Sequence, residues 1–230
     1  MSIPTPLVNL TKATEFVASM SLPTPRMAVL GDPQKLHSEA YNAIREADRA
    51  LVEGVTSIQR LPKDETRTEV SKHGVAKQIA DRTVAVLESS QRTIERVAAK
   101  LSDEATALID GAFYLPPGRA VMHSDMAAWI NRNRDTVEGS AKIDEAVRTN
   151  IEFAAVVYHT PHQLLGMSQD SKNNLWGKAA KQHIPKAVGL LIQSDELSAI
   201  AANYPQVARS VAASFYNSAL AERVKNRVEA

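Results

Sequence analysis

The chain has 230 residues, with 27 Lys and Arg against 26 Asp and Glu, and it contains no cysteine. The missing cysteines exclude disulfide scaffolds, cysteine-based zinc sites, iron–sulfur clusters and thiol catalysis. An apolar content of 44% is typical of a soluble globular protein, and a formal charge of +1 provides no overall field to attract nucleic acid or an anionic membrane.

Residues 1–32 differ in composition from the rest of the chain, because four prolines interrupt them. Proline lacks a backbone donor and favours extended conformations in the residue before it, so we predict an extended N-terminal arm. A solvated, disordered tail is the alternative. The many apolar side chains favour an arm that packs on its own body or on a neighbouring subunit. The candidate partner-binding residues of this arm are Leu7, Leu10, Phe16, Met20 and Met27.

No part of the sequence predicts targeting to or insertion into a membrane. The first residues lack the charged start and long apolar run of a secretory signal. The most apolar run, 151–158, is far shorter than the roughly 20 residues that cross a bilayer, and it carries Glu152. We therefore expect a soluble protein without a membrane partner.

Residues 33–110 carry two helical patterns, which predict a long, charged helical hairpin. Asp32 and Pro33 are typical of an N-cap followed by the first helical position, and Pro62 ends the first helix. Basic and acidic side chains alternate in nearly equal number, which predicts a solvated, coiled-coil-like surface and argues against a nucleic-acid partner. The apolar stripes are Leu36, Ala40, Ile44, Ala47, Leu51, Val55, Ile58 and Leu61, then Val75, Ile79, Thr83, Val86, Ser90, Ile94, Val97 and Leu101.

Residues 111–230 predict a compact helical domain of shorter helices, which completes an all-α fold. We expect helices near 124–134, 140–159, 171–183, 185–202 and 205–228. No run shows sustained strand alternation. The domain begins at the bulky segment 113–117, whose Phe113 and Tyr114 are the remaining candidate partner-binding residues. That segment is either an exposed docking loop or a staple that holds the linker on the core.

Two further segments have both a functional and a structural interpretation. His159 and His162 are spaced for metal binding on one helical face, but Pro161 separates them, and a helix C-terminus explains His159 without a metal.

The stretch 172–181 combines lysines with Trp176. This combination suits either binding of single-stranded nucleic acid or a core helix whose basic side faces solvent. Nucleophile-elbow, phosphate-loop and zinc-protease motifs are missing, so we predict no catalytic residue, cofactor or metal.

A charged helical hairpin followed by a small helical domain resembles helical virion proteins of tailed bacteriophages. The hairpin segment that carries the resemblance reads LHSEAYNAIREADRALVEGVTSIQRLPKDETRTEVSKHGVAKQIADRTVAVLESSQRTIERVAAKL. The resemblance covers about a third of the chain and rests on texture and order of elements. It implies a non-enzymatic structural role as a minor head, neck or capsid-associated component, with other virion proteins or further copies of itself as partners. A cytoplasmic helical interaction module and a metal-dependent helical enzyme built on His159 and His162 are the alternatives.

Overall fold

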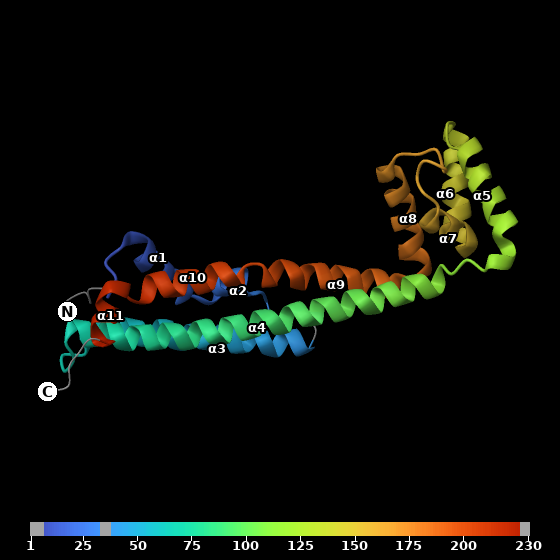
Figure 1. Ribbon diagram of the computed structural model, residues 1–230. Helices are drawn as coiled ribbons and strands as arrows, with labels where there is room; N and C mark the ends of the chain where they lie inside the picture. The colour runs from blue at the N-terminus through green and yellow to red at the C-terminus, as the bar shows by residue number, and fades with distance from the viewer. Residues whose placement is uncertain (1–6, 33–37, 226–230) are drawn as a thin grey trace. The chain divides into compact units, whose positions relative to one another are not determined.

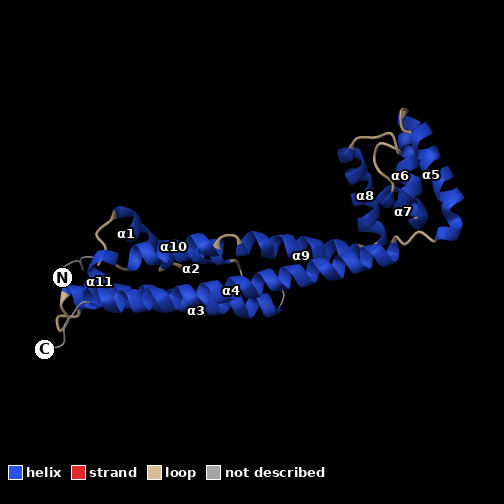
Figure 2. Ribbon diagram, viewed as in Figure 1, coloured by secondary structure: helices blue, strands red, loops and turns tan. Residues whose placement is uncertain are grey.

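The computed structural model describes residues 7–32 and 38–225, and every regular element within these ranges is helical (Figures 1 and 2). The all-α prediction is confirmed. No helix in this part of the chain is both long and apolar enough to span a bilayer. The α-helices are α1 (Thr11–Met20), α2 (Pro23–Leu30), α3 (Ser38–Arg60), α4 (Glu69–Ala112), α5 (Ala120–Asn133), α6 (Val137–Thr149), α7 (Ile151–His159), α8 (Gln169–His183), α9 (Pro185–Ala201), α10 (Tyr204–Phe215) and α11 (Ser218–Lys225), with 3₁₀ turns η2 (Leu61–Lys63) and η3 (Pro117–Arg119).

The chain divides into two compact units, one of residues 1–99 with 195–230 and one of residues 100–194. This division differs from the predicted boundaries after residues 32 and 110. The last helices belong with the hairpin because α10 buries an apolar face that includes Val207, Val211 and Phe215. The second unit is therefore an insertion in the chain of the first, and α4 and α9 each contribute residues to both units.

The predicted apolar stripe of the first hairpin helix is the buried face of α3. Every stripe position from Ala40 to Leu61 is at most 8% exposed. The spacing of three and four residues places these side chains on one side of the helix, so the periodicity identified the core directly. Pro33, the predicted first residue of this helix, and the stripe residue Leu36 lie outside the described residues.

Near its start, α4 buries a face displaced by one residue from the predicted stripe. Ala76, Ala80 and Leu87 are fully buried, whereas Val75 and Ile79 are half-buried. Alanine allows neighbouring helices to approach closely. A stripe that is defined by large apolar residues does not identify such buried alanines. From Ser90 onward the predicted and observed faces coincide.

Gly54 marks the point where α3, α4 and α10 meet. A Cβ at this position would lie 2.7 Å from Oγ1 of Thr83 on α4 and 3.1 Å from Cε2 of Phe215 on α10. The Thr83 hydroxyl donates to the Ile79 carbonyl at 2.9 Å, so this polar side chain is satisfied within its own helix. Close packing of three helices thus explains a glycine inside α3.

The N-terminal segment contains two helices where the prolines predicted an extended arm. Pro23 and Pro25 lie in the first turn of α2, where a missing N–H breaks no intrahelical hydrogen bond. Helix α1 contacts α2, α3 and α10, and α2 contacts α3 and α10. Of the two expected locations for the arm, its own body is the one observed for residues 7–32.

The unit of residues 100–194 is built around α7. Four consecutive residues of this helix, from Ala154 to Val157, are at most 2% exposed, so the helix is covered on all sides. Helices α5, α6 and α8 contact it (Figure 1). Asn150 separates α6 from α7, which the sequence predicted as one helix, because its side chain accepts from the Glu152 N–H at 2.8 Å and caps α7.

Candidate partner-binding groove

The seven candidate partner-binding residues have very different exposures. Leu10, Met27 and Tyr114 are exposed, at 64%, 41% and 65%. Leu7 and Phe16 are half-buried. Met20 and Phe113 are 5% and 0% exposed, so both are core residues of their units and present no surface to a partner. Phe113 therefore acts as the predicted staple, while Tyr114 beside it faces solvent.

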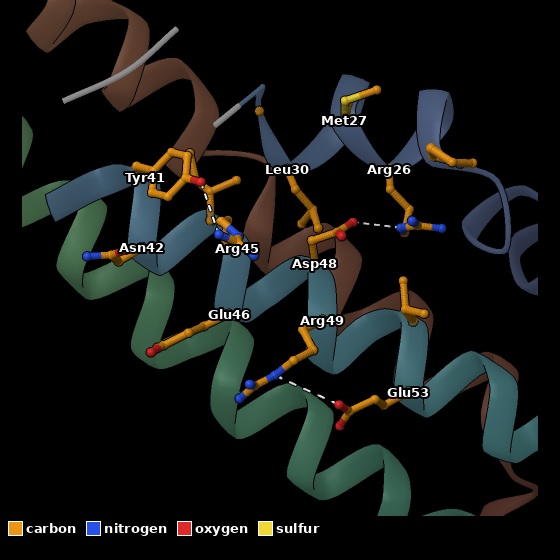
Figure 3. A pocket seen from close by; sticks show the side chains of 14 residues that line it. Arg26, Met27, Leu30, Tyr41, Asn42, Arg45, Glu46, Asp48, Arg49 and Glu53 are labelled. Atoms are coloured by element: carbon orange, nitrogen blue, oxygen red, sulfur yellow. Dashed lines mark hydrogen bonds and ion pairs between the residues drawn. The ribbon is translucent and has the colours of Figure 1, made fainter. Parts of the chain in front are cut away.

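Met27 lines a groove of about 1030 Å³ between α2 and α3 in the unit of residues 1–99 and 195–230. We call it the α2–α3 groove (Figure 3). Leu30 and Ile44 form part of its apolar lining and are almost fully buried, whereas Met27 is accessible. The lining comprises Pro23, Arg26, Met27, Leu30, Gly31, Tyr41, Asn42, Ile44, Arg45, Glu46, Asp48, Arg49, Val52 and Glu53.

A partly buried ion pair joins the two walls of the groove. Nε of Arg26, on α2, donates to Oδ1 of Asp48, on α3, at 2.6 Å (Figure 3). Arg26 is only 8% exposed, and its Nη1 also donates to the Met20 carbonyl at 2.9 Å, which closes the end of α1. A buried guanidinium is tolerated because a carboxylate and a carbonyl both satisfy it.

The C-terminal end of α2 is held by the start of α10. The Tyr204 hydroxyl donates to the Leu30 carbonyl at 3.2 Å, and the Asn203 side chain donates to the Val29 carbonyl at 3.3 Å. Both carbonyls lie in the last turn of the helix, where no intrahelical donor follows. Burial, together with the nearby Asp48 carboxylate, raises the pKa of Tyr204 well above its usual range, so its hydroxyl remains a donor.

Gly31 completes the attachment of α2. Its φ of +95° and ψ of 155° belong to a region that only glycine adopts without strain. A Cβ there would lie 2.9 Å from Cδ1 of Ile200 on α9. The α2 wall of the groove is therefore fixed by an ion pair at one end and by a capped, tightly packed turn at the other.

Charge along the groove is mixed and balanced. Arg45 lies over the Tyr41 ring, 5.5 Å from its centroid, and Arg49 pairs with Glu53 at 3.8 Å (Figure 3). Both members of the Arg49–Glu53 pair are more than 70% exposed, so these charges are available to a partner at little cost. The ionisable lining consists of Arg26, Arg45 and Arg49 with Glu46, Asp48 and Glu53.

His159 is engaged in a structural contact. Its Nε2 lies 2.8 Å from the Phe113 carbonyl oxygen, a distance that suits the tautomer with the proton on Nε2 as donor. The ring thereby connects the end of α7 to the residue that follows α4. Among the residues that the structure describes, no three His, Asp or Glu side chains gather as a set of metal ligands.

The basic stretch 172–181 lies in α8, with its aromatic side chain directed toward the core. Trp176 is half-buried and stacks on Tyr158, with ring centroids 5.8 Å apart. Lys172 donates to the Tyr158 carbonyl at 3.0 Å, and burial lowers the pKa of this lysine. Lys178 pairs with Asp144 at 2.6 Å. These contacts correspond to the core-helix interpretation of the stretch.

The sequence did not reveal the Arg26–Asp48 pair. Arg26 is the only charged residue between Glu15 and Asp32, which is the one signal that could have drawn attention to it. Asp48 follows the buried Ala47 and lies at the edge of the apolar stripe, so a partner from another helix can reach it. The two residues are 22 positions apart, and helical periodicity carries no information about such a contact.

No model of a known protein family matches the sequence, and no curated protein and no solved structure is significantly similar to it.

Proposed function

We propose that the protein is a non-enzymatic structural component of a bacteriophage virion and that it assembles through the α2–α3 groove. The observation that carries this proposal is the groove itself, which combines an accessible methionine with a balanced set of charges on a rigid frame. Methionine adapts its shape to an incoming side chain, which suits a contact surface. The frame is already ordered before a partner binds, so binding costs little conformational entropy.

The occupant that we assign to the groove is a second copy of this chain. Three basic and three acidic side chains line the groove, and Lys and Arg nearly balance Asp and Glu in the whole chain. A two-fold interface brings the same patch of each copy together, and a patch that carries both signs can pair with itself. A strongly acidic or strongly basic partner would leave half of the lining charges opposed by like charges.

Exposed apolar side chains outside the groove lining supply further apolar area. A stable dimer buries about 800 Å² on each partner, so the interface extends beyond the groove. Leu22, immediately before α2, is 57% exposed, and Leu10, immediately before α1, is 64% exposed. Together with Met27, these side chains place accessible apolar area on the N-terminal helices of the unit.

The virion part of the proposal is supported by the resemblance of the charged hairpin to helical virion proteins. Mass spectrometry of virus particles purified from a host that carries the gene tests whether the chain is a virion component. Peptides of this chain in washed particles, at a constant ratio to the major capsid protein, support the proposal. Recovery of the chain only in the soluble fraction, bound to a single cellular protein, contradicts it and favours the helical interaction module.

A further inference from the structure

His73 is unusual because its side chain is buried and accepts a hydrogen bond from the backbone of another segment. The residue lies on α4 and is 3% exposed. Its Nδ1 accepts the backbone N–H of Asn217 at 3.0 Å, from the connection between α10 and α11. Nδ1 must be unprotonated to accept this bond, so the contact requires a neutral imidazole.

Asn217 in turn organises the start of α11. Its side-chain oxygen accepts from the N–H groups of Ala219 and Leu220, at 3.0 and 3.3 Å. These are the groups at a helix N-terminus that have no intrahelical partner. His73 therefore positions the residue that caps the final helix of the described chain.

The residue after His73 is also adapted to α11. A Cβ on Gly74 would lie 2.8 Å from Cγ2 of Val224, so only glycine allows α11 to lie this close to α4. Lys77, one turn further along, lies 5.9 Å from the centroid of the Tyr216 ring. Three positions within about one turn of α4 thus contact the segment 216–224 by a hydrogen bond, a close packing contact and a cation–π contact.

Charged groups surround the imidazole on several sides. Glu69 on α4 interacts with His73, and Lys72 pairs with Glu69 at 3.1 Å while donating to the Pro62 carbonyl in η2 at 3.1 Å. From the C-terminal segment, Tyr216 and Glu222 interact with Lys77, which also pairs with Asp81 at 2.6 Å. The carboxylates are thus engaged with lysines.

We propose that His73 is a pH-sensitive latch, which holds α11 against α4 while the imidazole is neutral and releases α11 when the imidazole is protonated. A protonated ring carries hydrogen on both nitrogens, so Nδ1 then opposes the Asn217 N–H instead of accepting from it. The cap of α11 loses its anchor, and Val224 separates from Gly74. Release exposes the surface of α4 around Gly74 and the inner face of α11, including the buried Ala221.

The direction of the pH effect follows from the burial of the ring. Desolvation lowers the pKa of His73 below its usual value of about 6.5, and the Glu69 carboxylate opposes this shift only in part. The neutral, latched form therefore predominates above about pH 6.5. Its contribution to stability is lost as the pH falls from there through the lowered pKa of the folded state.

The test measures amide hydrogen exchange of the full chain at about pH 5 and about pH 7.5, on either side of the ordinary histidine pKa, after correction for the intrinsic rate. The peptide that covers 216–225 is compared with a peptide from α3. We expect the protection of α11 relative to α3 to fall at the lower pH by up to about thirtyfold, because a released imidazole with the ordinary histidine pKa of about 6.5 is protonated about thirty times more often than it is neutral at pH 5. Equal relative protection at both values overturns the proposal.

The control variant is His73→Asn, whose amide oxygen lies near the position of Nδ1 and accepts a hydrogen bond without titrating. Protection of α11 in this variant should not depend on pH. A pH dependence equal to that of the wild type assigns the effect to another group and also overturns the proposal. Should the variant fail to fold, NMR titration of the wild type decides, because the Asn217 amide shift must follow the same midpoint as the His73 ring.

Discussion

Nε of Arg26 lies 2.6 Å from Oδ1 of Asp48 and connects the N-terminal helices to the first helix of the hairpin. The contact explains how a proline-containing segment becomes part of the folded body. Arg26 also closes the end of α1 through the Met20 carbonyl, so one side chain positions α1, α2 and α3. The α2–α3 groove exists because this pair fixes its walls.

Replacing Asp48 by Asn should destabilise the unit of residues 1–99 and 195–230. The change leaves the buried guanidinium of Arg26 without a counter-ion. We expect a loss of about 2 kcal/mol, less than for a fully buried pair because the Asp48 side chain is 40% exposed. Urea denaturation measures this loss. Arg49→Gln is the matched control, since its exposed pair with Glu53 contributes less than about 1 kcal/mol. Equal effects of the two changes would contradict the structural role of Arg26.

Gly31→Ala should be more damaging than an ordinary glycine substitution. The positive φ and the 2.9 Å approach to Ile200 make a cost of about 2 kcal/mol or more. Gly177→Ala in α8 provides the opposite case, because a Cβ there meets nothing within 4 Å. That substitution should stabilise its unit by about 0.5–1 kcal/mol through helix propensity. Thermal unfolding of the two variants should shift in opposite directions, and a shared direction would refute this account of Gly31.

Tyr204→Phe should remove the donor from the Leu30 carbonyl without creating a large cavity. Because Tyr204 is fully buried, we expect a loss of about 1 kcal/mol in the free energy of unfolding. Tyr114→Phe, at a 65% exposed tyrosine, should change that free energy by less than about 0.5 kcal/mol. If both variants unfold like the wild type, the hydroxyl of Tyr204 does not hold α2.

His159→Gln should preserve the contact with the Phe113 carbonyl, whereas His159→Asn should lose it. The glutamine amide nitrogen lies near the position of Nε2, and the shorter asparagine does not reach it. We expect the asparagine variant to be less stable by about 1 kcal/mol, measured by chemical denaturation. A larger loss in the glutamine variant would point to another role for this ring.

The helical core was predictable because amphipathic periodicity and burial describe the same face. On α3 the predicted stripe from Ala40 to Leu61 is the observed core. The displacement at Ala76 and Ala80 on α4 was not predictable in this way, because small residues pack closely without a strong apolar signal. Asn150 and Asn217 were also missed as helix boundaries, since a capping side chain acts locally inside an otherwise continuous pattern.

The candidate site was predictable only in part. Of the predicted partner-binding residues, Leu10, Met27 and Tyr114 are exposed, whereas Met20 and Phe113 are buried. In a segment interrupted by prolines, the sequence does not show whether an apolar side chain faces the core or the solvent. The groove depends on Arg26 and Asp48, whose contact is created by tertiary packing rather than by local sequence.

The central claim is self-association through the α2–α3 groove, and sedimentation-velocity analysis of Met27→Glu tests it most directly. The wild type should sediment as a dimer or larger species in a concentration-dependent manner, and Met27→Glu should sediment as a monomer. Val121→Glu, at a 79% exposed apolar residue outside the groove lining, should assemble like the wild type. A monomeric wild type, or a Met27→Glu variant that assembles as well as Val121→Glu, would contradict the account.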